Sequence, residues 1–356
     1  LSMTQTLILT GDINLMGVTN PKEPFAKVAD TLKKADAVFS NLECCFYDSP
    51  DSAPSQQEWK SAGSQTLQRE GFHVPAKVAE ALNIAGISAI GNANNVNFGD
   101  EAIKSSNAVL DGYGIPHTGS GTNREAALKS AIVKTKKLRY GMVQRTSVYW
   151  PSTHEATEQT PGVAAMKVHT AYRPLVDEKA ANRPGVPPEI LTWADPAYLQ
   201  DFIKQIKALK KKCDIAIASI HWGYDGKVYA YQEEIAKALI DAGADIIMGH
   251  GPHEPLAVAT YKKKPIFYGM GSFSFKQGHR GRKHPDWVGL MARVTLDGRK
   301  IKKTSIQFVR HNEKNETLLK PLKAEAGSLD MMQAKSERFG TKFKAKGDEL
   351  VFLENK

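Results

Sequence analysis

The stretch DIIMGHGPHEP, residues 245–255, joins a short apolar run to two histidines that flank a Gly-Pro pair. The run predicts a buried strand. A Gly-Pro corner turns the chain tightly and its proline stiffens the turn, so the corner can aim His250 and His253 into one cavity. The same sequence is also compatible with two polar residues on an ordinary turn that bind no metal. A metal site is favoured over a simple turn only if other parts of the chain provide further metal-ligating residues.

Polar residues of metal-ligating type also follow four other predicted strands. They are Asp12 and Asn14 after the first strand, Asn41 and Glu43 after the second, Asn92, Asn94 and Asn95 after the third, and His221 at the end of the strand 214–220. The carboxyl ends of strands form the ligand crevice of an open α/β sheet, so we expect these side chains to converge. A helix cap or a turn explains each of them singly. Five such strand ends together favour a metal site.

The alternation of short apolar runs with amphipathic segments indicates an α/β fold. Strands are predicted at 6–10, 36–40, 87–91, 131–134, 140–145, 214–220, 245–248 and 265–268, and helices at 24–34, 75–85, 100–112, 196–212 and 229–242. Residues 290–296 and 301–309 flank an Asp-Gly turn and predict a β-hairpin. We expect one domain over residues 3–325. Within it, 150–194 is predicted to be an inserted loop over a site, or else a plain surface excursion, and 326–356 a C-terminal extension packed on the outside.

Composition limits the partners of the protein. The 356 residues carry 48 Lys and Arg against 38 Asp and Glu, a formal net charge of +10, which favours anionic partners. No nucleic-acid motif and no apolar run of roughly 18 residues occurs, so neither a nucleic acid nor a membrane is expected as a partner. Three cysteines and no recognisable secretion signal favour a cytoplasmic protein. The sequence does not indicate an oligomeric state.

Seven sequence blocks in one order resemble the CapA family of poly-γ-glutamate capsule synthesis proteins. They are GD (11–12), ADAVFSNLE (35–43), GISAIGNANN (86–95), GSGTN (119–123), IHWGYD (220–225), DAGADIIMGHGPH (241–253) and KPIFYGMGSFSF (264–275). Because this family is similar to the calcineurin-like metallophosphoesterases, the resemblance implies a four-layer α/β/β/α sandwich with a metal centre between its two sheets. The similarity covers residues 6 to 310.

The resemblance also implies roles for individual residues. Asp12 and Asn14 would serve one metal, Glu43 would bridge, Asn95 and His221 would serve a second metal, and His250 and His253 would each complete one coordination sphere. Asp12, Glu43, His221 and His250 would then carry catalysis. Carboxylate, amide and imidazole ligands without a thiolate suit Mn²⁺, Zn²⁺ or Fe²⁺, one or two ions per chain.

The main hypothesis is a metal-dependent hydrolase in which metal-activated water attacks a phosphoester, or an amide or ester, of an anionic small molecule. Cationic side chains in segments that reach toward the crevice would bind the anionic group, although each is also explained as a solvated surface cation. They are Arg145, Arg173, Lys276, Arg280 and Arg282.

Three positions depart from the family pattern. Val96 stands where the family reads His, so this position cannot protonate a leaving group; His73, His279 or His284 would have to supply a proton from elsewhere. Gly251 also replaces a family His, and Ser272 stands in the related Gly-Asn-Phe. Two alternatives therefore stay open: a metal-dependent lyase or isomerase, and a non-catalytic protein that binds a polyanion such as polyglutamate.

Overall fold

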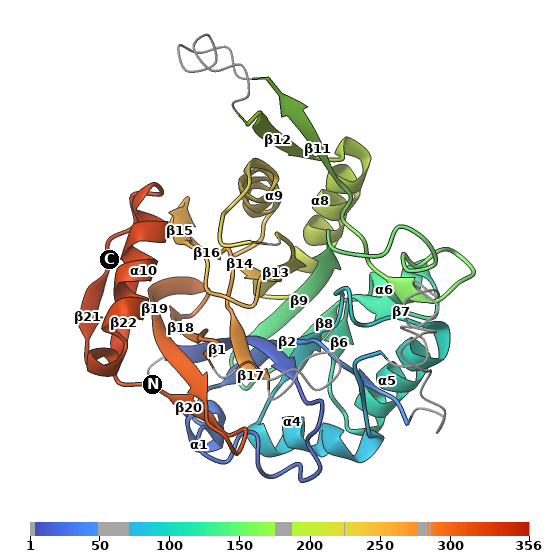
Figure 1. The fold of residues 1–356 in the computed structure, drawn as a ribbon, viewed down its shortest axis with the longest axis horizontal. Helices are drawn as coiled ribbons and strands as arrows, with labels where there is room; N and C mark the ends of the chain where they lie inside the picture. The colour runs from blue at the N-terminus through green and yellow to red at the C-terminus, as the bar shows by residue number, and fades with distance from the viewer. Residues whose placement is uncertain are drawn as a thin grey trace.

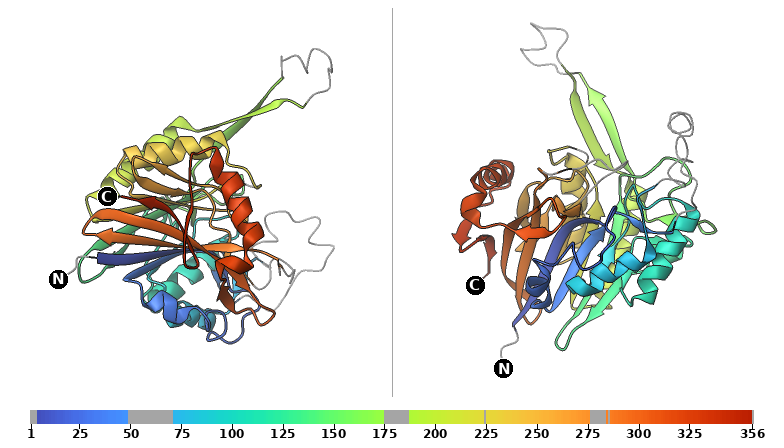
Figure 2. Two further views of the ribbon diagram at one scale, coloured as in Figure 1. Left: turned by 90° about the vertical axis from the view of Figure 1, so that its left-hand side faces the viewer. Right: turned by 60° about the horizontal axis from the view of Figure 1, so that its bottom comes forward.

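Two β-sheets pack face to face, and helices cover the outer face of each, which gives an α/β/β/α sandwich (Figure 1). The structure is a computed structural model and describes residues 4–48, 71–174, 187–223, 225–275, 284 and 286–355. In the side view of Figure 2, helices α8 (Pro196–Lys210) and α9 (Ala230–Asp241) lie on one side of the paired sheets, and α1 (Ala29–Lys33) and α4 (Glu80–Ala85) lie on the other. The predicted fold class is confirmed.

The larger sheet has ten strands. Its order is β21 (Lys344–Lys346), β22 (Glu349–Glu354), β19 (Lys300–His311), β18 (Gly289–Asp297), β1 (Thr4–Asn14), β2 (Ala37–Leu42), β5 (Ala89–Gly91) and β6 (His117–Thr118), with β17 (Ser272–Phe275) paired to β1 and β20 (Thr317–Leu319) paired to β19. The smaller sheet has six strands, in the order β15 (Val258–Tyr261), β16 (Lys264–Phe267), β14 (Ile246–His250), β13 (Ile215–His221), β9 (Arg139–Thr146) and β8 (Ala131–Lys134).

Short elements connect these layers. The described chain adds three two-stranded pairs, β3 (Cys45–Phe46) with β4 (His73–Val74), β7 (Ser120–Gly121) with β10 (Gly162–Val163), and β11 (Val168–Arg173) with β12 (Glu189–Ala194). The further helices are η1 (Ala76–Ala79), α5 (Asp100–Gly112), α6 (Arg124–Ala127), η3 (Leu322–Ala324) and α10 (Ala326–Glu337).

Strand β1 shows why continuous apolar runs form the centre of the molecule. Leu7 and Leu9 pack in the core between the two sheets, whereas Ile8 and Ile13 pack under helices α1 and α4. Side chains alternate between the two faces of a strand. A strand covered on both faces therefore needs apolar residues at every position, and this is the pattern that the sequence shows.

The predicted elements are present, with one helix much shorter than expected. The prediction of a helix over 24–34 is wrong for its first part, because only Ala29–Lys33 is α-helical. Phe25 stacks on Phe273 with ring centroids 6.1 Å apart, and Thr317 N donates a hydrogen bond to Pro24 O over 2.8 Å. These tertiary contacts hold the preceding residues in successive turns.

Two segments differ from their predicted form. Within 150–194, β11 and β12 make an antiparallel ribbon that projects from the body (Figures 1 and 2), so this part is regular structure and not the loop that was predicted. The end of the chain does more than pack on the outside, because β22 pairs with β19 and buries Leu350 and Leu353 in the core between the sheets. No helix in the described ranges is long and apolar enough to cross a membrane.

Candidate metal centre

The strand ends that carry the predicted ligands meet between the two sheets. In the larger sheet Asp12 of β1 pairs in register with Asn41 of β2, and Glu43 follows β2, where its N–H donates to Ile13 O over 2.7 Å. In the smaller sheet His221 of β13 pairs in register with His250 of β14. The crevice therefore receives carboxylates from one sheet and imidazoles from the other, as expected at the carboxyl ends of parallel strands.

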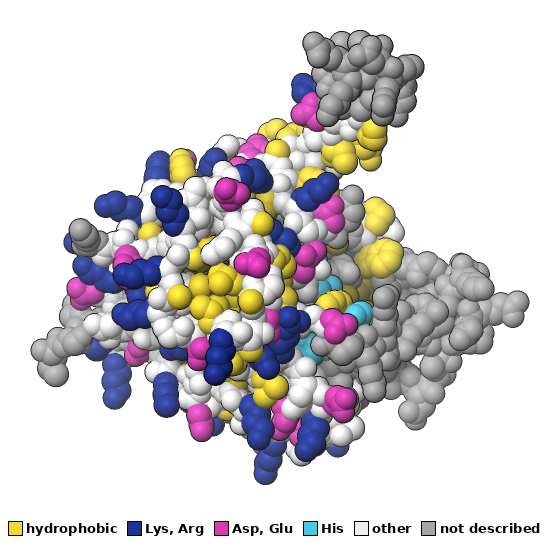
Figure 3. Space-filling model, turned by 60° about the vertical axis from the view of Figure 1, so that its left-hand side comes forward, with side chains coloured by type: hydrophobic (Ala, Val, Ile, Leu, Met, Phe, Trp, Pro, Cys, Tyr) yellow, Lys and Arg dark blue, Asp and Glu magenta, His cyan; other side chains and the backbone are white. Residues whose placement is uncertain are grey.

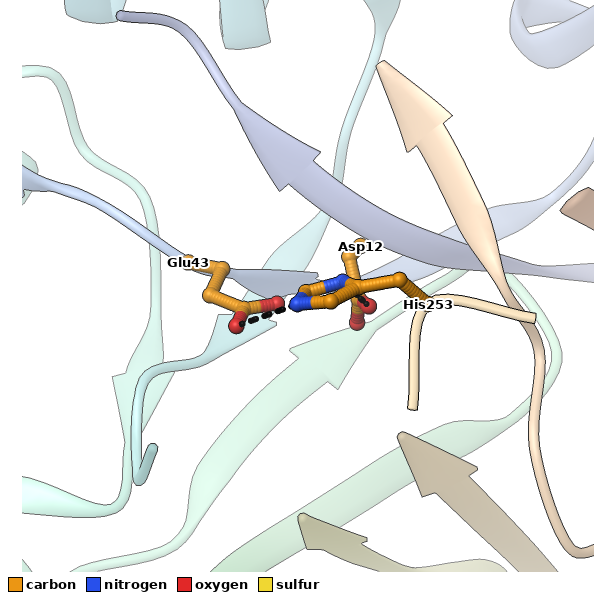
Figure 4. Close-up of side chains that lie close together, drawn as sticks. All are labelled: Asp12, Glu43 and His253. Carbon is orange, nitrogen blue, oxygen red and sulfur yellow. Dashed lines mark hydrogen bonds and ion pairs between the residues drawn. The ribbon is translucent and has the colours of Figure 1, made fainter. Parts of the chain in front are cut away.

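Three of these side chains are close enough to share one ion. One ligand atom each from Asp12, Glu43 and His253 lies within 4.8 Å of the others. The His253 ring lies between the two carboxylates (Figure 4), with Nδ1 3.1 Å from Asp12 Oδ2 and Nε2 3.5 Å from Glu43 Oε1. The sequence separates these residues widely, so only the fold brings them together.

Two further histidines complete the cluster. His250 Nδ1 lies 3.1 Å from Asp12 Oδ1, and His221 Nε2 lies 3.7 Å from Glu43 Oε1. The Thr146 hydroxyl donates to Val148 O over 2.8 Å, so its oxygen accepts the proton of His221 Nδ1 at 3.3 Å. That hydrogen bond selects the tautomer in which Nε2 carries a lone pair, and it points that lone pair into the cluster.

The Gly-Pro corner aims the histidines as predicted, through unusual backbone conformations. Gly251 has φ of 141°, and a Cβ at this position would come within 2.2 Å of Trp222 O. His253 also lies in the left-handed region, with φ of 61°, which few residues other than glycine adopt. The space beside Trp222 explains why this chain cannot carry a histidine at position 251 in this conformation.

A buried amide network orients Asp12; the sequence predicted that Asn41 and Asn94 would lie here, and it did not predict Gln144. Asn41 Nδ2 donates to Asp12 Oδ1 over 2.8 Å. Gln144 Nε2 donates to Asn41 Oδ1 over 3.1 Å, and Asn94 Nδ2 lies 3.3 Å from the same oxygen. The signal for Gln144 was a polar residue inside the apolar run of β9, a pattern that indicates a buried and hydrogen-bonded side chain.

The two carboxylates have opposite pKa shifts. Burial raises the pKa of Asp12, but hydrogen bonds to His250 and His253 outweigh it and hold this pKa far below its usual range. Burial also raises the pKa of Glu43, and the nearby Asp12 carboxylate adds to the effect against the attraction of His253, so the net shift is well upward. Asp12 is therefore the more strongly anionic member of the pair.

The three histidines are also shifted. Burial lowers the pKa of His221 to about 4 and lowers the pKa of His250. Burial would lower the pKa of His253 as well, but Glu43 and Asp12 raise it to about 9. Glu43 and Asp12 thus favour the protonated form of His253, whose ring lies between them (Figure 4).

The remaining predicted ligands are placed differently. Asn14 is buried at the end of β1, where its Oδ1 accepts from Met16 N over 2.8 Å. Asn95 is half-buried, and its backbone carbonyl accepts a hydrogen bond from the Trp150 indole over 3.2 Å. Its neighbour Asn94 is the residue that joins the network around Asp12. The role of Asn95 as a ligand remains a prediction.

The predicted substrate cations do not gather at this centre. Arg145 is buried on the opposite face of β9, where it donates to Asp201 Oδ2 over 2.8 Å and to Gln205 Oε1 over 2.8 Å in helix α8. Arg173 pairs with Glu189 across the projecting ribbon. The expectation that these two arginines reach the crevice is wrong. Lys276, Arg280 and Arg282 lie outside the described residues.

An aromatic stack beside His253 was also missed by the sequence reading. The Trp287 ring stacks on His253 with centroids 4.7 Å apart, and His284 stacks on Trp287 at 3.6 Å. Phe275 packs edge-on against both His253 and Trp287. These rings form one wall of the centre and hold the strained His253 in place.

The amino-acid sequence is similar to those of several bacterial proteins. It is 25% identical over 313 residues to the uncharacterized protein y4uA of Sinorhizobium fredii, covering 76% of this chain and 66% of that protein. It is 26% identical over 260 residues to the capsule biosynthesis protein CapA of Bacillus anthracis, covering 71% of this chain and 54% of that protein. The chain thus spans between half and two thirds of the length of these relatives.

A solved structure supports the fold independently. The crystal structure of a novel phosphatase from Mycoplasma pneumoniae superposes with a TM-score of 0.51 at 13% identity, over 87% of this chain and 95% of that one. The two chains share the fold of an α/β sandwich. The model of the family described as bacterial capsule synthesis protein PGA_cap matches residues 6–277. The chain therefore belongs to the PGA_cap family, the family of the CapA proteins.

Proposed function

We propose that this protein is a metal-dependent hydrolase that acts on a phosphoester, or an amide or ester, of an anionic small molecule. The observation that carries the proposal is the cluster of Asp12, Glu43 and His253, whose ligand atoms lie within 4.8 Å of one another. They come from three segments far apart in the chain and meet at the carboxyl ends of the strands. A turn or a helix cap accounts for no such convergence.

The chemistry of the donor set fits a divalent cation. Glu43 Oε2, His221 Nε2 and His250 Nε2 are buried, and the described residues offer them no hydrogen-bond partner. Leaving such a group unpaired costs about 1–3 kcal/mol each, and coordination of a cation would remove that cost. Carboxylate and imidazole ligands suit Mn²⁺, Zn²⁺ or Fe²⁺. The neighbouring thiol is unsuited, because burial raises the pKa of Cys45 to about 12.

When bound, a metal of this kind lowers the pKa of a coordinated water and stabilises a developing oxyanion. The residues of the chain provide the charge of the site and fix the orientation of the ligands. Asp12 and Glu43 supply the negative charge, Asn41 fixes the carboxylate of Asp12, and Thr146 fixes the ring of His221. The burial of these side chains excludes bulk water, which strengthens electrostatic interactions in the site.

Hydrolysis also requires a group that donates a proton to the leaving group. Val96 is a buried apolar residue at the position where the family carries His. Of the other histidines considered from the sequence, His284 lies in the aromatic stack next to His253, and His73 lies in β4 with its ring packed on Tyr47 at 5.0 Å. His279 lies outside the described residues. His284 is therefore the histidine that we propose to be best placed near the centre.

Metal analysis combined with activity measurements tests the proposal. The purified protein is assayed on a panel of phosphomonoesters, phosphodiesters, esters and amides, before and after chelation and after re-addition of Mn²⁺, Zn²⁺ or Fe²⁺. We expect chelation to abolish turnover and one of the metals to restore it. An Asp12→Asn variant should lose both metal and activity. An Asp241→Asn variant, which alters an exposed carboxylate paired with Lys262, should keep both.

The two alternatives predict different outcomes. Val96 favours a metal-dependent lyase or isomerase, and such an enzyme would convert candidate substrates without consuming water. The description of the matched family as a capsule synthesis protein is compatible with the second alternative, a non-catalytic protein that binds a polyanion such as polyglutamate. Binding of that kind would depend strongly on salt and would survive Asp12→Asn. Turnover that persists after chelation would contradict the metal-dependent hydrolase directly.

A further inference from the structure

A tyrosine-rich cavity of about 450 Å³ lies beside the metal centre, at the base of the projecting ribbon. Its walls come from the segment after β9, from one face of the ribbon β11–β12, and from the start of α9. Four tyrosines contribute to its lining, Tyr149, Tyr172, Tyr229 and Tyr231. The proposed mechanism uses none of them.

The lining suits an uncharged planar group. No described residue that lines this cavity is Lys, Arg, Asp or Glu. The Tyr229 and Tyr231 rings are stacked, with centroids 6.3 Å apart and an interplanar angle of 13°, so they present parallel flat surfaces. Aromatic pairs gain energy beyond the burial of their area. A polyanion would find no cation on this surface.

The cavity and the metal centre share a stretch of backbone. Ser147 N, in the cavity wall, donates to the carbonyl of His221 over 2.9 Å. Gly223, two residues after His221, donates its N–H to the Tyr231 hydroxyl over 2.6 Å. Both the cavity and the centre therefore lie at the carboxyl ends of β9 and β13, and the backbone around His221 borders both.

The ribbon exposes apolar side chains on the side that faces the cavity. Tyr172 and Ile190 are 69% and 47% exposed, and both line the cavity. Strand alternation places Trp193 on the opposite face, where it stacks on His169 at 5.5 Å. Figure 3 shows hydrophobic side chains along the ribbon, while the Lys and Arg side chains in this view are interspersed with acidic ones. Exposed apolar residues next to a site indicate a binding surface.

We propose that this cavity binds the planar, uncharged ring of a substrate whose anionic group lies at the metal centre. The substrate class is therefore an aryl or heterocyclic phosphoester, or a related ester, rather than a linear polyanion. The inference rests on the proposed function for the position of the anionic group. Ring recognition itself depends only on the cavity, since binding requires no turnover.

Calorimetry on the metal-loaded protein tests the inference with two non-hydrolysable probes, phenylphosphonate and methylphosphonate. They share the anionic head and differ in the ring. We expect phenylphosphonate to bind at least about tenfold tighter. Tyr172→Ala and Ile190→Ala should each reduce that preference about threefold or more, without changing the affinity for methylphosphonate. Trp193→Ala, on the other face of the same ribbon, is the matched control and should leave both affinities unchanged.

The outcomes separate the two proposals. Equal affinity for the two probes, no binding of phenylphosphonate, or a preference that Tyr172→Ala and Ile190→Ala leave intact would overturn the inference about the ring. Ring-dependent binding in a protein that hydrolyses nothing would support the cavity and contradict the hydrolase. All three substituted side chains are partly exposed, and circular dichroism confirms that the variants are folded.

Discussion

His253 Nδ1 lies 3.1 Å from Asp12 Oδ2, although 241 residues separate them along the chain. The contact joins the end of β1 in one sheet to the corner after β14 in the other. It places the His253 ring between Asp12 and Glu43, at the point where the two sheets form one site. The predictions below test the elements that hold this site together.

Replacement of Asn41 should weaken metal binding without removing a ligand. Asn41 Nδ2 donates to Asp12 Oδ1 over 2.8 Å, and groups that orient a ligand in this way typically contribute about 10–100-fold to metal affinity. We expect Asn41→Ala to lower the affinity by that factor in a competition titration with a chelating dye. Asn83→Ala removes an amide in α4 that donates to Tyr113 O over 3.0 Å, and it should leave the affinity unchanged. Equal affinities for the two variants would show that the amide does not position Asp12.

Restoring the family histidine at position 251 should destabilise the protein. Gly251 has φ of 141°, and a Cβ there would lie 2.2 Å from Trp222 O. We expect Gly251→His to lower the free energy of unfolding by about 2 kcal/mol or more, measured by denaturant titration. Gly327→Ala is the control, because it adds a Cβ in helix α10 with nothing within 4 Å. That variant should be neutral or slightly more stable. A stable Gly251→His protein would mean that the corner can adopt another backbone path.

Arg145 should matter for stability and not for substrate binding. It is 2% exposed and pairs with Asp201 and Gln205 behind β9. We expect Arg145→Met to lower the free energy of unfolding by about 2 kcal/mol. The loss is not larger because Asp201 keeps a second cationic partner, Arg124, at 2.7 Å. The KM for any substrate should not change. Arg173→Met on the exposed ribbon should alter stability by less than about 0.5 kcal/mol. A raised KM in Arg145→Met would show that Arg145 does contribute to substrate binding.

His154 should make stability depend on pH in the mildly acidic range. Burial lowers the pKa of His154 to about 4, and its Nδ1 accepts a hydrogen bond from Trp150 N over 3.0 Å that the protonated ring cannot accept. The folded protein therefore binds this proton less well than the unfolded chain, in which a histidine has a pKa of about 6.5. The stabilising contribution is complete above pH 6.5 and is lost as the pH falls toward 4, by about 3 kcal/mol.

Denaturant titrations at pH 7.5, 6, 5 and 4 measure that loss. The comparison is with His154→Gln, whose side chain keeps a donor and an acceptor but does not titrate. We expect the difference in unfolding free energy between the two proteins to shrink as the pH falls. Parallel curves for the two proteins over this range would contradict the assignment to His154.

The sequence alone determined much of the fold. Continuous apolar runs predicted strands buried on both faces, and β8 and α5 have the predicted bounds, 131–134 and 100–112. The polar residues directly after those runs predicted where the site would lie, because the end of a strand is a local property of the chain. The convergence of Asp12, Glu43, His221, His250 and His253 follows from that position.

Only the tertiary structure decided which neighbouring side chain faces the site. Gln144 and Arg145 are adjacent in β9, and Gln144 joins the amide network of Asp12 whereas Arg145 pairs with helix α8. Both faces of this strand are buried, so the apolar pattern carries no period that distinguishes them, and a shift of one residue would exchange their roles. Asn94 and Asn95 lie in the turn after β5, and there too only the folded chain shows that Asn94 is the one that joins the amide network. In β9, the register between strands, set by contacts across the whole sheet, makes that choice.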